Sequence, residues 1–144
     1  MSADDEEPSC NIRPATVGDG PSVLALIEPY VAHRKLLPRT LDEIEELLVN
    51  GFVAELDGEI VGFVALEIYS KKLAEIRSLC VAEGFQRHGI GKELVTAFVR
   101  RARERSILEV MAITSAEEFF RACGFDFTLP GEKKAFFLQT RPEY

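Results

Sequence analysis

Two glycines, Gly89 and Gly91, lie at the junction between an apolar run, "RSLCVAE", and an amphipathic stretch that begins "GKELV". The apolar run predicts a strand, and the apolar spacing after the glycines predicts a helix. Amide groups at the start of a helix have no partner within it, and they carry the positive end of its dipole. Because glycine lets a phosphate approach the backbone closely, this junction predicts a phosphate or pyrophosphate site.

Two common phosphate-binding patterns do not fit the segment "GFQRHGIGKELV". The Walker pattern requires serine or threonine after its lysine, and Glu93 follows Lys92. A dinucleotide-binding fingerprint that starts at Gly89 requires a further glycine where Leu94 stands. From the spacing alone, a plain glycine-bearing turn is an equal alternative to a phosphate site.

The composition is that of a water-soluble globular chain. The 144 residues are 47% hydrophobic and 28% charged, which is typical of one domain with a core of its own. Residues 1–9 are acidic and are expected to form a disordered tail, which leaves residues 10–144 as a single domain. No apolar run approaches the ~20 residues that span a bilayer, so no membrane partner is expected.

Charge and cysteine usage exclude further classes of protein. With 17 basic and 24 acidic side chains the formal net charge is −7, which argues against a nucleic-acid partner. An anionic ligand must therefore be attracted by individual cations rather than by the whole molecule. Cys10, Cys80 and Cys123 have neither the spacing of metal ligands nor that of a disulfide framework. We expect no metal and a reducing, cytoplasmic location.

Strand and helix patterns alternate along the chain, which predicts a mixed α/β sheet. A capping box at Thr40 and Glu43 begins one helix, and Asp57-Gly58 predicts a tight hairpin turn. Another helix opens at Pro21 and is disturbed at Pro29. The expected strands are 10–15, 52–56, 59–69, 73–81, a buried one at 107–113, 125–129 and 134–140; the expected helices are 21–27, 40–49, 89–105 and one that Ser115 caps and Gly124 ends.

The segment "LCVAEGFQRHGIGKELV" resembles the pyrophosphate-binding segment of the GNAT superfamily, the acetyl-coenzyme A-dependent N-acetyltransferases. Its hallmark, Gln/Arg-x-x-Gly-x-Gly/Ala after the fourth strand, falls on Gln86, Gly89 and Gly91. The later segment "EEFFRACGFDF" is similar to the second landmark, a helix that ends in Gly-Phe. The resemblance implies a mostly antiparallel sheet flanked by helices, with strands four and five splayed to admit acetyl-coenzyme A.

The same resemblance assigns the cofactor-binding residues. The backbone of the fourth strand would pair with the pantetheine arm, and the loop amides would hold the pyrophosphate. By position these residues are Leu79, Cys80, Val81, Gln86, Arg87, His88, Gly89, Ile90, Gly91 and Lys92.

A narrower resemblance is to the acetyltransferase domain of N-acetylglutamate synthase, in its short stand-alone form. The segments "LLPRT" and "LPGEKKAFFLQTR" discriminate this family, and their arginines, Arg39 and Arg141, would hold the two carboxylates of glutamate. Without the resemblance, each arginine would be taken as a solvated surface charge. After Arg141 the chain reads "PEY" instead of the family's serine-bearing segment, and the family's polar run before the last helix is altered to "ITSAEE".

Acyl transfer to an amine requires that the amine lose a proton. Glu75 is the candidate base, and strand alternation places it on one face with Arg77, Leu79 and Val81. Arg77 is grouped with the substrate-binding residues, and an ion pair between Glu75 and Arg77 is the structural alternative. The backbone amide near Val81 would meet the oxyanion.

Direct transfer in a ternary complex requires no enzyme nucleophile, so Cys80 is expected to be a buried apolar residue. The superfamily's usual tyrosine acid is replaced by Phe120, which is tolerable because a thiolate leaves readily.

Three functions remain open at this stage: acetylation of glutamate in arginine biosynthesis, acetylation of another small amine or a peptide N-terminus, and non-catalytic binding of acetyl-coenzyme A. A small amino acid is the expected partner, and whether the chain forms a homodimer is open.

Overall fold

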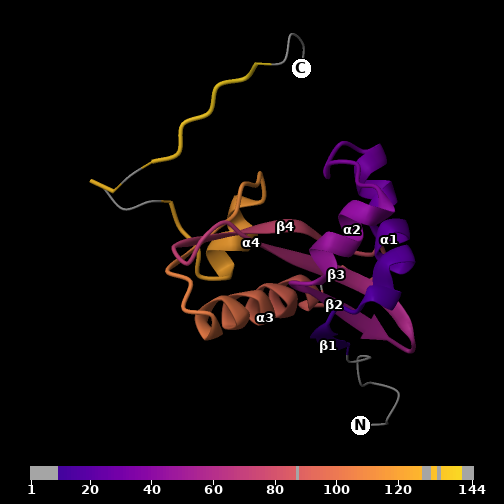
Figure 1. The fold of residues 1–144 in the computed structure, drawn as a ribbon. Helices are drawn as coiled ribbons and strands as arrows, with labels where there is room; N and C mark the ends of the chain where they lie inside the picture. The colour runs from indigo at the N-terminus through magenta and orange to yellow at the C-terminus, as the bar shows by residue number, and fades with distance from the viewer. Residues whose placement is uncertain (1–9, 87, 128–130, 133, 141–144) are drawn as a thin grey trace. The chain divides into compact units, whose positions relative to one another are not determined.

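The computed structural model describes residues 10–86, 88–127, 131–132 and 134–140, and the chain divides after Thr114 into two units (Figure 1). The larger unit contains a five-stranded sheet in the order β1-β2-β3-β4-β5, antiparallel except where β4 and β5 run parallel. This architecture confirms the predicted mixed, mostly antiparallel sheet. The elements are β1 (Asn11–Pro14), a 3-10 turn (Val17–Asp19), α1 (Gly20–Ala32), α2 (Leu41–Leu48), β2 (Gly51–Leu56), β3 (Glu59–Ile68), β4 (Leu73–Val81), α3 (Ile90–Glu104), β5 (Glu109–Met111) and, in the C-terminal unit, α4 (Glu117–Ala122).

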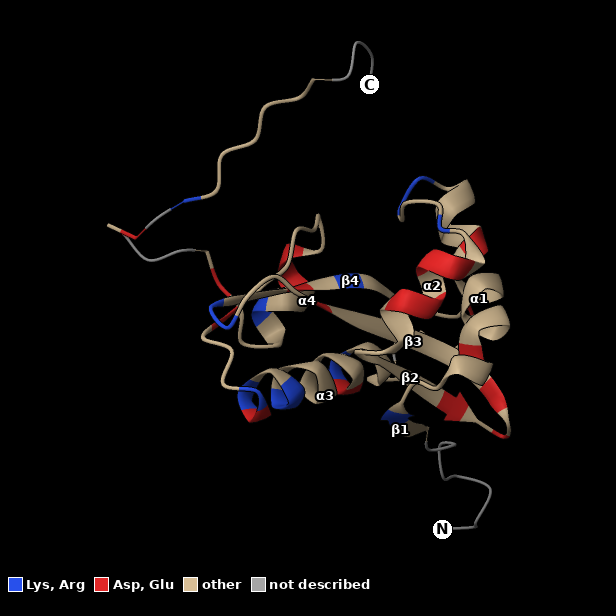
Figure 2. Ribbon diagram, in the orientation of Figure 1, with Lys and Arg blue, Asp and Glu red and all other residues tan. Residues whose placement is uncertain are grey.

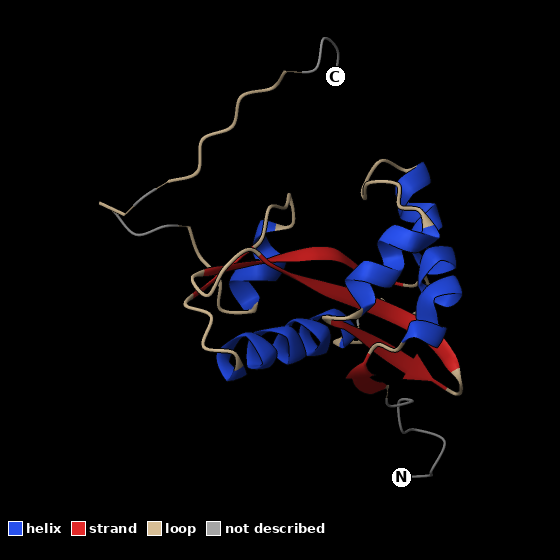
Figure 3. Ribbon diagram, in the orientation of Figure 1, coloured by secondary structure: helices blue, strands red, loops and turns tan. Residues whose placement is uncertain are grey.

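Helices cover both faces of the sheet in the larger unit (Figures 1 and 3). α1 and α2 pack on one face, and α3 crosses the other. Burial of a large apolar side chain stabilises a fold by ~1.5–3 kcal/mol, so each face contributes substantially. The core under α1 and α2 contains Val23, Ile27, Ile44, Leu48, Val53, Phe63, Ala65 and Cys80, and the buried residues of α3 are Ile90, Leu94, Val95, Phe98 and Ala102.

Gly62 in β3 lies where α3 approaches the sheet most tightly. A methyl group at this position would lie 2.9 Å from Leu94 Cδ1 and 3.3 Å from Ile90 Cγ2, both on α3. It would also lie 3.2 Å from the Cβ of Ala54 on the neighbouring strand. The absence of a side chain here therefore sets how closely α3 packs on β3.

A β-bulge interrupts β4 and changes which residues share a face. Phe63 pairs with Cys80 and Ala65 pairs with Arg77, so two residues of β4, Ser78 and Leu79, lie opposite the single residue Val64 of β3. Ser78 lies inside this interval and has a left-handed φ of 54°. Because opposed residues share a face, Arg77 and Cys80 lie on the same side of the sheet.

The bulge corrects the predicted alternation along β4. Glu75 and Arg77 do share a face, since they pair with Glu67 and Ala65. Val81 pairs with Gly62 and therefore lies on the opposite face, whereas the sequence analysis placed it with Glu75. The extra residue at the bulge shifts the two-residue period by one, which no local pattern in "EIRSLCV" indicates.

Two local signals are confirmed. Glu43 N donates to Thr40 Oγ1 at 3.2 Å and Thr40 N donates to Glu43 Oε1 at 3.0 Å, so the capping box begins α2 as predicted. Asp57 and Gly58 have φ values of 49° and 82°, as a type I′ turn requires.

The predictions for helix ends and for the end of the chain need correction. α1 continues past Pro29 to Ala32, although the proline has no N–H to bond the Ala25 carbonyl and its ring crowds that carbonyl. The cap of α4 is Ala116 and not Ser115, but Gly124 ends the helix with φ 93° as predicted.

Of the strands predicted after residue 106, only part of the first is present. The strand expected at 107–113 shrinks to β5, which is only partly buried. Residues 125–127 and 134–140 are not strands, and no ladder joins them to another segment within the described residues. The rest of the strand expected at 125–129 lies outside the described residues. Phe136 and Leu138 are exposed, so apolar character alone did not produce a strand.

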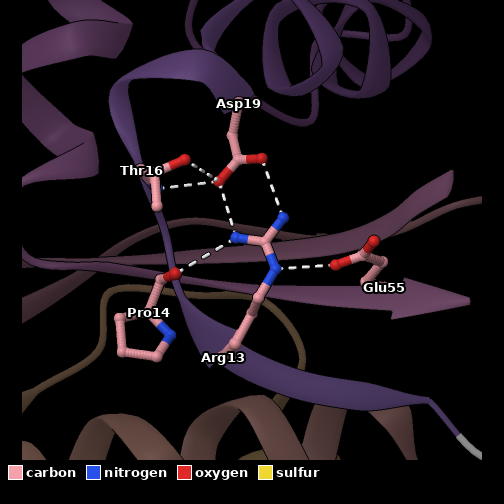
Figure 4. A network of polar contacts seen from close by, with 5 residues as sticks. All are labelled: Arg13, Pro14, Thr16, Asp19 and Glu55. Carbon is pink, nitrogen blue, oxygen red and sulfur yellow. Dashed lines mark hydrogen bonds and ion pairs between the residues drawn. The ribbon is translucent and has the colours of Figure 1, made fainter. Parts of the chain in front are cut away.

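A polar network ties the start of α1 to the first two strands (Figure 4). Arg13 on β1 donates to both oxygens of Asp19, at 2.8 and 2.9 Å, and to Glu55 Oε2 on β2 at 2.7 Å. Asp19 also accepts from the backbone N of Thr16 at 2.7 Å. The hydrogen bonds from Arg13 outweigh burial and lower the pKa of Asp19 to about 2.

We expect Asp19→Asn to lower the free energy of unfolding by about 2 kcal/mol at pH 7, measured by urea denaturation. The folded pKa lies below the unfolded value, so this contribution is present above about pH 4 and is lost as pH falls through about 2. The difference between wild type and variant should shrink over that window. Glu55→Gln, at a more exposed partner of Arg13, should cost less than ~1 kcal/mol. A difference that stays constant down to pH 2 would contradict the role of the ionised carboxylate.

Candidate active site

β4 and β5 separate after a short parallel contact. Pairing joins Leu73 to Glu109, Ala74 to Val110 and Glu75 to Met111. No later residue of β4 pairs with another strand on this side within the described residues. The predicted splay is therefore present, and it exposes the backbone edge of residues 76–81 to a ligand.

The peptide after Val81 shows how this edge is oriented. Ala82 N donates to Val61 O on β3 at 2.7 Å, so the Val81 carbonyl points away from β3. That carbonyl accepts hydrogen bonds from the Tyr30 hydroxyl and from Gln86 Nε2, the latter at 3.1 Å. In an extended residue N–H and C=O point to the same side, so the amide of Val81 also faces the open edge. This is the direction that the predicted oxyanion contact requires.

The loop after β4 presents the start of α3 without a side-chain cap. Gly89 is the N-cap residue, with φ 78°, and as a glycine it provides no side-chain capping bond. The first helical bond runs from Glu93 N to Gly89 O at 3.0 Å, so the amides of Ile90, Gly91 and Lys92 precede the helical ladder. A methyl group on Gly89 would meet nothing within 4 Å. The space beside Gly89 would admit an anion, and the pyrophosphate site at this loop stays a prediction.

The predicted loop residues lie around this helix start. His88 and Gly89 line one end of a groove of about 650 Å³ that follows α3, so the loop is accessible. Arg87 lies outside the described residues. Cys80 packs in the core under α1 and α2, and burial raises the pKa of its thiol to about 12. Cys80 is therefore an apolar core residue and not a nucleophile.

Glu75 is a buried carboxylate with two side-chain partners. Only 6% of the residue is exposed, and its Oε1 accepts from the Tyr69 hydroxyl at 2.5 Å. Arg77 Nη1 lies 3.4 Å from the same oxygen and 3.1 Å from Glu67 Oε2. The bond to Glu75, and then burial, raises the pKa of Tyr69, so the phenol keeps its proton. Glu75 thus carries the ion pair that the structural alternative foresaw, and Arg77 serves two carboxylates.

Arg39 lines a cavity of about 300 Å³ beside α1. Its side chain is 15% exposed, and its Nε is buried without a hydrogen-bond partner within the described residues. Its Nη1 lies 4.0 Å from Oε2 of Glu43, which is a long ion-pair contact. The nearby helix α2 carries acidic side chains along much of its length (Figure 2). A mostly covered arginine whose buried Nε lacks a hydrogen-bond partner favours an anionic ligand. Arg141 lies outside the described residues, so the second predicted carboxylate contact stays a prediction.

Sequence reasoning missed three contributors to this site: Tyr30, Tyr69 and the bulge at Ser78. Tyr69 had an available signal, because the hairpin register places it on the face of Glu67 and Glu75. Tyr30 had none, since its partners lie 51 and 56 residues away in the sequence. Among the described residues, no cluster of three His, Cys, Asp or Glu side chains could hold a metal, and no helix is long and apolar enough to cross a membrane.

Comparison with known proteins agrees with this geometry. Residues 23–125 match the acetyltransferase (GNAT) family. An uncharacterised N-acetyltransferase from Chlorobaculum tepidum is 34% identical over 79% of this chain and 74% of its own. An amino-acid acetyltransferase from Mycobacterium tuberculosis is 33% identical over 79% of this chain and 67% of its own.

A solved structure extends the comparison to bound ligands. N-acetylglutamate synthase from Neisseria gonorrhoeae, complexed with coenzyme A and N-acetyl-glutamate, matches with a TM-score of 0.73 and 29% identity. The match covers 81% of this chain but only 28% of the synthase. Several other amino-acid acetyltransferases are likewise matched over about a third of their length, for example 31% of the protein from Actinobacillus pleuropneumoniae.

Coenzyme A should raise the melting temperature by roughly 5–10 °C at a hundred-fold excess over its Kd, because it binds only the folded chain. Gly91→Leu should abolish that shift by blocking the helix start, while leaving the melting temperature without ligand unchanged or higher, since leucine favours helix over glycine. Gly58→Ala is the matched control. Its left-handed turn should be strained, so the unliganded protein melts earlier but the ligand shift persists. A full shift in Gly91→Leu would rule out this loop as the pyrophosphate site.

Proposed function

The chain belongs to the acetyltransferase (GNAT) family and is an acetyl-coenzyme A-dependent N-acetyltransferase, and we propose that its acceptor is the α-amine of L-glutamate. In this proposal the open edge of β4 binds the thioester arm, and the start of α3 binds the pyrophosphate. The glutamate lies on the α1 side of β4, with Arg39 and Glu75 on either side of it.

Arg39 is the observation that carries the proposal. The protein has a formal net charge of −7, so it does not attract an acidic substrate as a whole. The Nε of Arg39 is buried and has no hydrogen-bond partner in the described part of the chain, which is unfavourable unless a ligand supplies one. A carboxylate can accept two parallel hydrogen bonds from one arginine, and glutamate has two carboxylates. The resemblance to N-acetylglutamate synthase implies that Arg141 holds the second carboxylate.

The neighbouring groups fit the chemistry of acyl transfer. Glu75 can accept the proton that the ammonium group of the acceptor must lose, with its carboxylate held by Tyr69 and Arg77. The Val81 amide faces the place where negative charge develops on the thioester oxygen. Transfer is direct within a ternary complex, since Cys80 stays protonated and buried. A thiolate with a pKa near ~8.5 leaves without an acid, which suits Phe120 at the position of the superfamily's tyrosine.

The relatives support this choice of acceptor. Several are named amino-acid acetyltransferase, and the matched synthase was solved with N-acetyl-glutamate. A role in arginine biosynthesis and a cytoplasmic location belong to the same proposal. Another small amine, a peptide N-terminus, or acetyl-coenzyme A binding without catalysis are the competing outcomes.

Arg39→Ala should raise KM for glutamate at least about ten-fold while leaving coenzyme A affinity unchanged, because loss of a buried charged partner costs ~2–5 kcal/mol. Arg141→Ala should have a similar effect. Lys35→Ala removes an exposed charge from the same segment and should leave KM unchanged. Aspartate should be a poor acceptor, since it is one methylene too short to reach both arginines.

The decisive measurement is release of free thiol from acetyl-coenzyme A with a panel of amino acids, polyamines and peptides. No turnover with glutamate above background, together with turnover of a peptide or a cationic amine, would disprove the glutamate proposal. No turnover with any acceptor, despite binding of coenzyme A, would favour the non-catalytic alternative.

Glu75→Gln should lower kcat by ~10²–10⁴-fold, because the amide keeps the shape of the carboxylate but cannot take a proton. Coenzyme A affinity should hold. Glu67→Gln is the matched control, since Glu67 shares Arg77 but is more exposed, and its kcat should change far less. An equal fall in kcat in both variants would mean that the loss comes from the unbalanced charge of Arg77 and not from loss of the base. Unchanged turnover in Glu75→Gln at neutral pH would assign the proton to a water chain or to another group.

A further inference from the structure

The hydroxyl of Tyr30 joins three segments that are distant in the sequence. Tyr30 lies in the last turn of α1, and its hydroxyl donates to the carbonyl of Val81 at the end of β4. It accepts from Gln86 Nε2 in the cofactor loop at 2.7 Å. The same nitrogen also donates to the Val81 carbonyl at 3.1 Å, which closes a triangle of hydrogen bonds.

This triangle fixes an acceptor that the sheet leaves unpaired. The Val81 carbonyl faces the open edge of β4, because Ala82 N is directed to Val61 on β3. Two donors, one from α1 and one from the loop, therefore determine the tilt of this peptide. Burial raises the pKa of Tyr30, so the hydroxyl remains a donor at neutral pH.

α1 also forms the wall of the Arg39 cavity. Ile27, Glu28 and Val31 line that cavity, and all three lie within one turn of Tyr30. One rigid helix thus borders the proposed acceptor site and holds the end of the strand that borders the proposed thioester site. The hydrogen bond from the Tyr30 hydroxyl therefore links the helix beside the acceptor site to the strand beside the thioester site.

We propose that Tyr30 is a positioning residue for acetyl transfer, which holds the Val81 peptide and the Gln86 side chain in the orientation that receives acetyl-coenzyme A. This inference rests on the proposed placement of the thioester arm along β4. Tyr30 keeps its proton throughout and touches none of the reacting atoms. Gln86, at the first position of the loop motif, accordingly acts through the strand carbonyl and through Tyr30 and not as a direct phosphate ligand.

Tyr30→Phe should weaken coenzyme A binding by about three- to ten-fold and lower kcat by a similar factor, because two hydrogen bonds are lost. Ser70→Ala, which removes an exposed hydroxyl from the β3–β4 turn, should leave affinity unchanged. Gln86→Leu, at an exposed position that the core does not depend on, should weaken binding to a similar extent. The double variant should bind coenzyme A about as weakly as whichever single variant binds it less tightly, because both changes break the same triangle of hydrogen bonds.

Backbone NMR gives a readout that loss of stability alone would not produce. In Tyr30→Phe, the ¹³C signal of the Val81 carbonyl and the ¹⁵N signal of Ala82 should move without ligand, while signals of the distant β2–β3 turn stay in place. Unmoved signals with unchanged affinity would overturn the proposal. Independent effects that multiply in the double variant would overturn it as well.

The same spectra separate this inference from the function on which it rests. Addition of coenzyme A to wild type should shift amide signals of residues 76–81. If those signals do not move although coenzyme A binds, the placement along β4 is wrong and the proposed function fails with it. If they move but Tyr30→Phe behaves as wild type, only the role of Tyr30 fails.

Discussion

A backbone amide or carbonyl that is not paired within a sheet needs another hydrogen-bond partner. In the larger unit this requirement applies to residues Ile76 to Val81, on the side of β4 that no strand among the described residues covers. β4 keeps its bonds to β3 over this stretch but loses β5 after Glu75. Part of the deficit is met internally, where Tyr30 and Gln86 bond to the Val81 carbonyl. The rest of the β4 edge stays open, and in the proposed function it binds the extended thioester arm of the cofactor.

Charge is arranged locally in a protein that repels acids as a whole. Arg77 forms ion pairs with two opposed carboxylates, Glu67 and Glu75. Its positive charge offsets the free-energy cost of burying the Glu75 carboxylate. Among the described residues, the ion-pair contact of Arg39 is Glu43, at 4.0 Å, and the Nε of Arg39 has no hydrogen-bond partner. In the proposed function these two arginines of the same formal charge have different tasks: Arg77 holds two carboxylates of the protein, and Arg39 binds a carboxylate of the substrate.

The features that could be predicted from sequence are those that depend on neighbours within a few residues. The Thr40 capping box, the Asp57-Gly58 turn and the glycine at the start of α3 belong to this class. The bulge at Ser78 does not, because it reflects how β4 fits β3 and not what "RSLC" prefers alone. The strands expected after residue 124 failed for a related reason, since a strand forms only when a partner pairs with it. The contact of Tyr30 with Val81 depends on the complete tertiary fold.

Gly62 links the interior of the sheet to the cofactor loop. It sits beneath Ile90 and Leu94, the first and fifth residues of α3, where even a methyl group would come within 2.9 Å of a side chain. A larger residue would lift that end of the helix and carry the loop glycines with it, although position 62 touches no ligand. If the loop binds the pyrophosphate as proposed, a substitution in the middle of β3 would weaken cofactor binding without touching the cofactor.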